Sequence, residues 1–327
     1  MRAMKITVIL CTYNRCQSLA KALQSVALSR LPNSVDWDVL VVDNNSNDQT
    51  RSVVEDYCRR HPKRFRYLFE SRPGKSNALN SGIREAKADV LAFMDDDVEV
   101  DPDWLHCLTN CLMEGGWSGA GGRILPENGF TPPRWMQMKE RYALAPLALF
   151  DYGPEAGELK VNPFGTNMAF RAEMFTRYGG FRTDLGPKPG SDIRHNEDAE
   201  FGSRLLAAGE RFWYEPSAIV YHSMPPERIR KEHFLAWWFD KARADIRQDG
   251  MQVQTRWYVA GVPLYLLRRL SIWSLRWMCS LGPARRFQCK IGVWRIIGMI
   301  KECRRRYLEE RQAVAVSGGS ASRTPPD

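Results

Sequence analysis

Residues 90–102 read Val-Leu-Ala-Phe-Met-Asp-Asp-Asp-Val-Glu-Val-Asp-Pro, so five apolar residues lead directly into three consecutive carboxylates. The apolar run is typical of a strand that is buried on both faces of a parallel sheet. We therefore expect Asp95, Asp96 and Asp97 at the carboxyl end of a central strand, where open α/β sheets bind their ligands. Pro102 stands where a helix is expected to start.

Three adjacent carboxylates repel one another, so bringing them together is costly unless they share a cation. Oxygen ligands suit Mg²⁺ or Mn²⁺, which also bind the phosphate groups of a substrate. The alternative is a solvated acidic turn in which Asp101 caps the following helix. The buried strand before the carboxylates favours the metal site.

The part of the chain before this stretch alternates between strand and helix patterns. Runs rich in β-branched residues predict strands, and apolar residues at helical spacing predict the helices between them. Four such repeats predict a right-handed parallel α/β sheet. The expected strands are 5–10, 37–43, 65–70 and 90–94, and the expected helices are 18–28, 50–60 and one that begins near residue 74.

Polar side chains follow each predicted strand, and we expect them at one edge of the sheet: Thr12, Asn14, Asp43, Lys75 and Asp95–Asp97. A nucleotide fits such a crevice, with Asp43 accepting from a base or ribose and Lys75 meeting a phosphate. The alternatives are an Asx turn or a helix cap for Asp43 and a solvated side chain for Lys75. Neither a P-loop nor a dinucleotide-binding motif is present.

Four stretches now form a pattern: Thr7-Val-Ile-Leu-Cys-Thr-Tyr-Asn-Arg15, Val41-Val-Asp43-Asn-Asn-Ser46, Gly74-Lys-Ser-Asn-Ala-Leu-Asn80 and Phe93-Met-Asp-Asp-Asp97. They resemble the successive motifs of family 2 glycosyltransferases of the GT-A fold, over roughly residues 5–225. The resemblance implies an inverting transferase that uses a nucleotide-diphosphate sugar and a divalent cation, Mg²⁺ or Mn²⁺. It also implies that Asp43 contacts the base, that Asp95 and Asp96 lie beside ribose and phosphate, and that Asp97 holds the metal.

Two later stretches continue the resemblance. The run Phe164-Gly-Thr-Asn-Met-Ala-Phe170 is similar to the family's glycine-asparagine strand. Asn167 would then bond a sugar hydroxyl, and the alternative is a buried structural amide. The run His195-Asn-Glu197-Asp198 matches the glutamate-aspartate motif. The match implies that Asp198 is the general base and that Glu197 positions the acceptor or the helix. The alternative is that both carboxylates only stabilise a helix N-terminus.

Residues 212–216 and 218–222 predict a closing pair of strands. A histidine at the place of His222 can complete the metal site or touch the pyrophosphate in related GT-A enzymes, so His222 joins Asp97 as an expected metal ligand. The alternative is a polar strand end. Arg228 and Arg230 follow closely and could also reach phosphate, but we favour solvated side chains for both.

The chemistry requires a base, because a sugar hydroxyl is a poor nucleophile until a carboxylate removes its proton. In-line attack on the anomeric carbon inverts its configuration and needs no nucleophilic carboxylate. Two other functions remain open: a nucleotide-sugar-binding protein without turnover, and a sugar nucleotidyltransferase. The expected acceptor is a saccharide or a lipid-linked saccharide.

The C-terminal third is basic. From Arg256 to Arg306 the chain has twelve lysines and arginines but one acidic residue, Glu302. Tryptophan and leucine alternate with these cations, which is typical of helices lying in a bilayer interface. The alternative is a helical lid with a solvated basic face. No nucleic-acid-binding motif is present, so we expect no nucleic-acid partner.

The length of 327 residues allows two domains. We expect a GT-A α/β domain over residues 1–226, with a mostly parallel sheet flanked by helices. A basic helical extension follows over 227–312, and a disordered tail rich in Ser, Gly and Pro over 313–327. We assign the proline-containing stretch 130–146 to the first domain as a surface excursion.

The eight cysteines include no C-x-x-C pair, which is typical of reduced thiols in a cytosolic protein. The apolar run at residues 5–10 is too short for a signal peptide. The sequence contains no uninterrupted run of about 20 apolar residues, so we expect no membrane-spanning helix. We therefore expect a cytoplasmic protein, peripheral at the inner face of the cell membrane.

Overall fold

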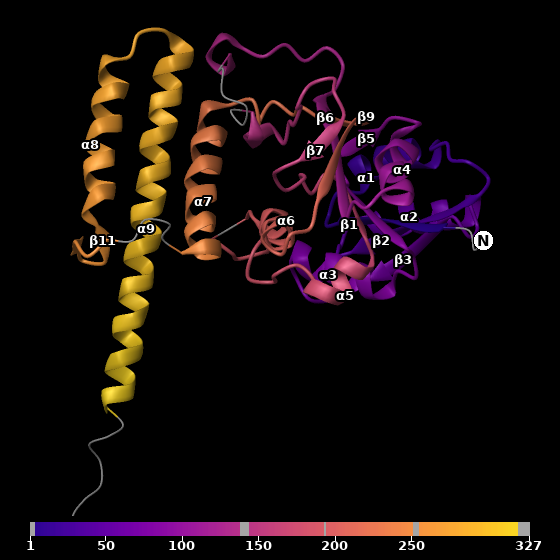
Figure 1. Cartoon of the computed structure of the whole chain (residues 1–327), viewed down its shortest axis with the longest axis horizontal. Helices are drawn as coiled ribbons and strands as arrows, with labels where there is room; N and C mark the ends of the chain where they lie inside the picture. The colour runs from indigo at the N-terminus through magenta and orange to yellow at the C-terminus, as the bar shows by residue number, and fades with distance from the viewer. Residues whose placement is uncertain (1–3, 138–143, 193, 251–254, 320–327) are drawn as a thin grey trace, which may run out of the picture. The chain divides into compact units, whose positions relative to one another are not determined.

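The computed structural model describes residues 4–137, 144–192, 194–250 and 255–319 (Figure 1). The chain forms two compact units. The first consists of residues 1–131 and 141–229, and the second of residues 132–140 and 230–327. The sequence predicted the change between domains at residue 226, close to the observed change after Ile229.

The first unit is built on a mixed sheet that has nine strands within the described residues. Their order is β3-β2-β1-β4-β8-β6-β9-β5, and β7 pairs with β9 outside this path. The strands are β1 (Met4–Thr12), β2 (Val35–Asp43), β3 (Phe65–Phe69), β4 (Val90–Asp95), β5 (Val98–Val100), β6 (Gly119–Pro126), β7 (Gly157–Leu159), β8 (Asn167–Arg171) and β9 (Phe212–His222).

Helices flank this sheet, which confirms the predicted α/β class (Figure 1). In α1, for example, Leu19, Leu23 and Val26 are buried because their spacing places them on one helix face. The helices of the first unit are α1 (Cys16–Ala27), α2 (Thr50–Arg60), α3 (Lys75–Glu85), α4 (Trp104–Glu114), α5 (Glu173–Tyr178) and α6 (Glu197–Ala207), with a 3₁₀ turn η2 (Ala145–Leu147).

The parallel half of the sheet positions the predicted site. Strand β1 pairs in parallel with β2 on one side and with β4 on the other. In this register Thr12 lies beside Asp43, and Cys11 lies beside Asp95. The polar residues that follow these strands therefore emerge from neighbouring strands at one edge, as the sequence predicted.

The stretch after the acidic turn differs from the prediction. Val98 and Val100 are buried and Glu99 is exposed, which is the alternation of a strand. These residues form β5, which pairs antiparallel with the end of β9. Helix α4 begins only at Trp104, so Pro102 precedes the helix rather than opening it.

The predicted pair of closing strands is one continuous strand, β9. Its parallel register with β6 shifts between Gly122 and Arg123. Pro216, Ser217 and Ala218 of β9 therefore have no paired residue in β6. Pro216 has no N–H group to donate to a neighbouring strand. Within the bulge no such hydrogen bond is needed, so proline is tolerated there. A Cβ atom on Gly122 would overlap the carbonyl oxygen of Ala218, so this close approach requires glycine.

Aromatic packing connects α6 to the sheet. Phe201 of α6 stacks on Phe175, with ring centroids 4.6 Å apart, and meets Phe170 of β8 edge-on at 5.1 Å. All three rings are buried. Each buried aromatic side chain contributes about 1.5–3 kcal/mol through its apolar area. This packing holds the N-terminus of α6 beside the start of β8.

The second unit consists of helices α7 (Lys231–Asp249), α8 (Leu264–Cys279) and α9 (Pro283–Gly319), a hairpin of β10 (Tyr258–Val259) and β11 (Val262–Pro263), and the 3₁₀ turn η1 (Arg134–Met136). Within this unit α9 lies between α7 and α8 (Figure 1). No described helix is both long and apolar enough to cross a membrane.

Two boundaries of the second unit differ from the sequence prediction. Trp135 packs against Phe234 and Phe287, with ring centroids 5.0 and 4.8 Å apart, so this part of the 130–146 excursion joins the helices. Helix α9 runs to Gly319, beyond residue 312, where we expected the helical extension to end. The rest of the predicted tail, residues 320–327, lies outside the described residues.

Candidate active site

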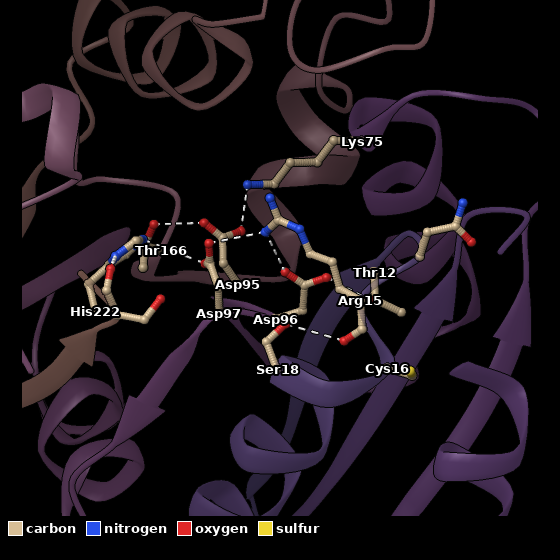
Figure 2. A network of polar contacts seen from close by, with 12 residues as sticks. Thr12, Arg15, Cys16, Ser18, Lys75, Asp95, Asp96, Asp97, Thr166 and His222 are labelled. Atoms are coloured by element: carbon tan, nitrogen blue, oxygen red, sulfur yellow. Dashed lines mark hydrogen bonds and ion pairs between the residues drawn. The ribbon is translucent and has the colours of Figure 1, made fainter. Parts of the chain in front are cut away.

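The turn after β4 carries the three consecutive carboxylates, and each has different partners (Figure 2). Asp95 accepts from Lys75 Nζ at 2.5 Å and from Thr166 Oγ1 at 2.7 Å. Burial opposes ionisation of Asp95, but the charge of Lys75 and these two hydrogen bonds outweigh it and lower its pKa to about 2. Asp95 is therefore a paired carboxylate in the folded chain.

Asp96 points into the protein and is buried. One of its oxygens accepts from Thr12 Oγ1 at 2.7 Å, and the other lies 3.0 Å from an Arg15 nitrogen. Burial raises the pKa of Asp96 to about 6, although the charge of Arg15 acts against this. The aspartate in the middle of the turn thus ties the turn to the loop after β1.

Asp97 and His222 lie side by side, because β5 and β9 pair Val98 with His222. The distance from His222 Nε2 to Asp97 Oδ1 is 3.5 Å. Asp97 Oδ2 also lies 2.8 Å from Arg228 and 3.0 Å from Arg15. Two cations from distant parts of the chain therefore meet the last carboxylate of the turn, and Figure 2 shows one of them, Arg15.

The hydrogen bonds of His222 assign its tautomer. Nδ1 lies 2.9 Å from the carbonyl oxygen of Ser223, so Nδ1 must carry the proton and donate it. Nε2 keeps its lone pair and accepts from Arg228 at 2.9 Å. Burial lowers the pKa of His222, which favours the neutral ring. A neutral imidazole held through Nδ1 is the form that ligates a metal through Nε2.

Asp97 and His222 therefore fit the coordination chemistry of one divalent cation. Among the described residues no group of three or more histidine, cysteine, aspartate or glutamate side chains is arranged to hold a metal. Two protein ligands suffice for Mg²⁺ or Mn²⁺, which commonly take their other ligands from substrate phosphates and water.

The N-terminus of α6 carries the second pair of carboxylates. Asp198 is half-buried and accepts from the backbone N–H of Gly165 at 2.7 Å. Thr166, the next residue, is the one that donates to Asp95. The dipeptide Gly165–Thr166 thus connects Asp198 to the acidic turn.

Glu197 is buried, and its Oε1 lies 3.7 Å from Lys75 Nζ. Burial and the neighbouring charge of Asp198 together raise the pKa of Glu197 to about 7, while the charge of Lys75 opposes both. Lys75 in turn is surrounded by acids. Burial disfavours its charge, but Asp95 and Glu197 outweigh burial and raise the pKa of Lys75. Lys75 therefore stays cationic between the two carboxylate groups.

Residues 7–179 match the family model described as glycosyl transferase family 2. The chain belongs to this family. It is 28% identical over 233 residues to the succinoglycan biosynthesis protein ExoM of Rhizobium meliloti, covering 71% of this chain and 70% of that protein. It is also 28% identical over 224 residues to a glucosyl-dolichyl phosphate glucuronosyltransferase of Haloferax volcanii, covering 68% and 70% of the two chains.

The fold also matches a solved structure. The mannosyltransferase PcManGT from Pyrobaculum calidifontis, solved with GDP-Man and Mn²⁺, superposes with a TM-score of 0.57 at 19% identity. The superposition covers 98% of this chain and 76% of that one. The GT-A fold, the family and the glycosyltransferase activity that the sequence predicted are thus confirmed.

In this family 2 glycosyltransferase, the residues predicted to face the nucleotide also hold its loops. Asp43 is buried and accepts from the backbone N–H of Ser46 and from the Tyr67 hydroxyl, both at 2.9 Å. Asn14, with a left-handed φ of 51°, accepts from the backbone N–H of Asn47 at 2.8 Å. Asp43 therefore holds the turn after β2 through the N–H three residues on, while the two loops come together beside the end of β1.

Asn167 is the predicted residue that the geometry places away from the site. It is buried, and its carbonyl oxygen accepts from Trp104 Nε1 at 2.8 Å. Its amide group donates to the carbonyl oxygens of Arg123 and Ala218. Both N–H donors are engaged inside the protein, so the geometry favours the structural amide over a contact to a sugar hydroxyl.

Two polar side chains of the site were not predicted, Arg15 and Thr166, and a third, Arg228, was considered for phosphate but expected to be solvated. The expectation for Arg228 was wrong, because its side chain is 25% exposed and contacts both Asp97 and His222. Three consecutive carboxylates need nearby cations to offset their repulsion. Arg15 could have been predicted on this basis, because it lies in the loop after the neighbouring strand β1. Nothing local identifies Arg228, which lies 131 residues from Asp97 in the chain.

Proposed function

We propose that this glycosyltransferase moves a sugar, with inversion, from a nucleotide-diphosphate donor to an acceptor hydroxyl with the help of Mg²⁺ or Mn²⁺. The observation that carries this proposal is the connection through Gly165–Thr166. Gly165 donates to Asp198, and Thr166 donates to Asp95. A proton acceptor and the acidic turn therefore share one short loop.

On the donor side, the nucleotide lies along the loops after β1, β2 and β4. Asp43 keeps unused oxygen lone pairs for a base or ribose group. Asp97 and His222 would hold the cation, which when bound supplies positive charge to the leaving diphosphate. Arg15 and Arg228 lie on Asp97 already, so they add positive charge beside the same phosphates.

On the acceptor side, Asp198 takes the proton of the attacking hydroxyl. The hydroxyl oxygen forms a bond to the anomeric carbon while the bond from that carbon to the diphosphate oxygen breaks. The nucleoside diphosphate leaves with the electron pair, and one displacement inverts the configuration. The Gly165 N–H orients Asp198 without protonating it. Glu197 keeps Lys75 in place between the acids.

The names of two relatives support a substrate class. One is named for succinoglycan biosynthesis, and another acts on a glucosyl-dolichyl phosphate. We infer a role in polysaccharide or glycolipid biosynthesis, with a saccharide or lipid-linked acceptor. Such an acceptor agrees with the proposed peripheral position at the inner face of the cell membrane.

The test of this proposal is Asp198→Asn. We expect a loss of about 10²–10⁴-fold in turnover, which is the usual contribution of a general base. Binding of UDP-, GDP- or dTDP-sugars, measured by thermal shift with Mn²⁺, should stay unchanged. The control is Asp56→Asn on the exposed face of α2, which should alter neither.

Product analysis separates the other functions. The proposal requires release of a nucleoside diphosphate, and release of pyrophosphate would instead indicate a nucleotidyltransferase. A protein that binds the sugar nucleotide but forms no product, with or without the Asp198 carboxylate, would be a binding protein and would refute the mechanism.

A further inference from the structure

Helix α8 lies at the edge of the second unit, where it packs against α9 (Figure 1). All residues of α8 are described, and Leu266 is the one that is buried. Large apolar side chains nevertheless cover much of the remaining helix surface. An edge helix of this kind needs a partner that the unit does not supply.

Four of the five exposed large apolar side chains of α8 lie along one row, which we name the apolar stripe: Leu264, Leu267, Leu275 and Met278; the fifth, Ile272, lies beside this row. With Ser271 between them, these residues follow steps of three and four, so they share one helix face. Their exposure rises along the helix from 41% at Leu264 to 69% at Met278. Such a row is an interaction surface rather than scattered surface leucines.

The stripe continues beyond both ends of the helix. At the start, the N–H of Leu264 donates to the carbonyl oxygen of Trp257, whose side chain is 67% exposed. At the other end Leu281, in the turn to α9, is 88% exposed. Nine of the fourteen exposed large hydrophobic side chains among the described residues fall between residues 257 and 281.

Exposed arginines occupy the surface of α8 next to the stripe: Arg268 adjoins it, and Arg269 and Arg276 lie farther round the helix on the same flank. Arg268, Arg269 and Arg276, which we name the arginine border, are all exposed. Arg276 stacks over the Trp273 ring at 5.4 Å. Within the described residues none of the three guanidinium groups hydrogen-bonds or pairs with a carboxylate. The border therefore presents three positive charges beside an apolar row.

We propose that the apolar stripe and the arginine border bind the surface of an anionic phospholipid bilayer, with α8 lying in the plane of the headgroups. The leucines and Met278 enter the boundary between headgroups and acyl chains. The guanidinium groups bind lipid phosphates, and their apolar stems extend along the stripe. Spanning is not required, because no described helix is suited to it.

The positive charge of the arginine border favours an anionic bilayer over the other partners that an apolar surface could bind. A second copy of the chain would bring two arginine borders together, and like charges would repel. A nucleic acid would neutralise the border but leave the stripe in water. An anionic membrane surface satisfies both rows at once.

The test uses the full-length chain and sedimentation with vesicles of phosphatidylcholine alone or of phosphatidylcholine and phosphatidylglycerol in equal amounts. We expect binding to the anionic vesicles only. Neutralising the border in Arg268→Gln/Arg269→Gln/Arg276→Gln should weaken that binding on the order of 100-fold, since each cation near an anionic surface contributes a several-fold gain. Changing the stripe in Leu267→Ser/Leu275→Ser/Met278→Ser should weaken it as strongly.

A matched control changes the same kinds of side chain in the first unit. Leu28→Ser/Arg59→Gln/Arg60→Gln alters an exposed leucine and two exposed arginines, and it should leave vesicle binding unchanged. Circular dichroism and the nucleotide thermal shift show that each variant is folded. A second readout is quenching of tryptophan fluorescence by brominated lipid, which Trp257→Phe should reduce.

Three results would overturn the proposal. The first is wild-type protein that ignores anionic vesicles. The second is stripe and border variants that bind as well as the control. The third is that the stripe and border variants alter the oligomeric state or the binding of duplex DNA, while their binding to vesicles stays the same. The nucleotide thermal shift is measured separately, so a negative result here leaves the proposed chemistry untouched.

Discussion

The two units of this glycosyltransferase handle charge in opposite ways. In the first, three carboxylates of one turn gather the cations Lys75, Arg15 and Arg228. In the second, the carboxylate of Glu302 is buried, and arginines surround it. Each carboxylate of the turn is paired with at least one cation, whereas in the described part of the helical unit Arg268, Arg269 and Arg276 are exposed and pair with no carboxylate.

The pKa values follow this difference. Burial raises the pKa of Asp96 to about 6, and the neighbouring aspartates raise it further against the pull of Arg15. Burial acts in the same direction on Glu302, but hydrogen bonds from Arg305 and Arg247 outweigh it and lower the pKa of Glu302. Burial alone therefore does not decide how a carboxylate behaves; the charge of its neighbours does. The proposed metal and phosphates would bind the first unit, and the proposed anionic membrane surface would bind the second.

The largest effect should come from breaking the cluster of the second unit. Glu302→Ala removes the buried carboxylate that Arg243, Arg247 and Arg305 share, which should lower the free energy of unfolding by about 3–5 kcal/mol. Urea unfolding followed by tryptophan fluorescence measures this change. Glu309→Ala on the exposed part of α9 is the control, and an equal loss there would mean that burial of the pair is unimportant.

The acidic turn should respond in function rather than in stability. Asp97→Ala removes a proposed metal ligand and should lower turnover by about a thousandfold. It should also abolish the part of the nucleotide thermal shift that depends on Mn²⁺. Asp103→Asn, an exposed change just before α4, is the control. A Mn²⁺-dependent shift that survives Asp97→Ala would exclude Asp97 as a ligand.

Glu197 should make stability depend on pH. Its pKa is about 7 in the folded chain, above the ordinary glutamate value, so the folded state binds the extra proton between these two values. Stability contributed by the protonated form is therefore lost as the pH rises through about 7. Glu197→Gln should gain about 2 kcal/mol relative to wild type between pH 5 and pH 8. Thermal unfolding at both pH values measures this gain, and Glu173→Gln on exposed α5 should show none.

The smallest effect should come from the loop that connects the two carboxylate groups. Thr166→Val removes the hydroxyl that donates to Asp95, and the loss of one hydrogen bond to a charged group costs about 1.5–3 kcal/mol. Turnover should fall by about tenfold. Thr166→Ser keeps the hydroxyl and should restore the rate. A serine variant as slow as valine would show that the methyl group, not the hydrogen bond, matters.

Local patterns in the chain were enough to predict the parallel half of the sheet. The helix predicted over residues 50–60 is α2, and the apolar run before Asp95 is β4. Both signals are periodicities within a short window, and parallel strands bring their carboxyl ends to one edge. The positions of Thr12, Asp43, Lys75 and the acidic turn at that edge follow from this rule.

The partners within the site depended on contacts between segments far apart in the chain. Arg228 reaches Asp97 across 131 residues, and Thr166 reaches Asp95 across 71. A hydrogen bond between such distant residues produces no pattern in the sequence of either segment, so the sequence does not predict it. For the same reason Asn167 looked like a sugar contact until Trp104, Arg123 and Ala218 were seen to use its amide. Short-range physics thus specifies which chemical groups the sheet edge presents, while long-range packing decides which of them remain available to a substrate.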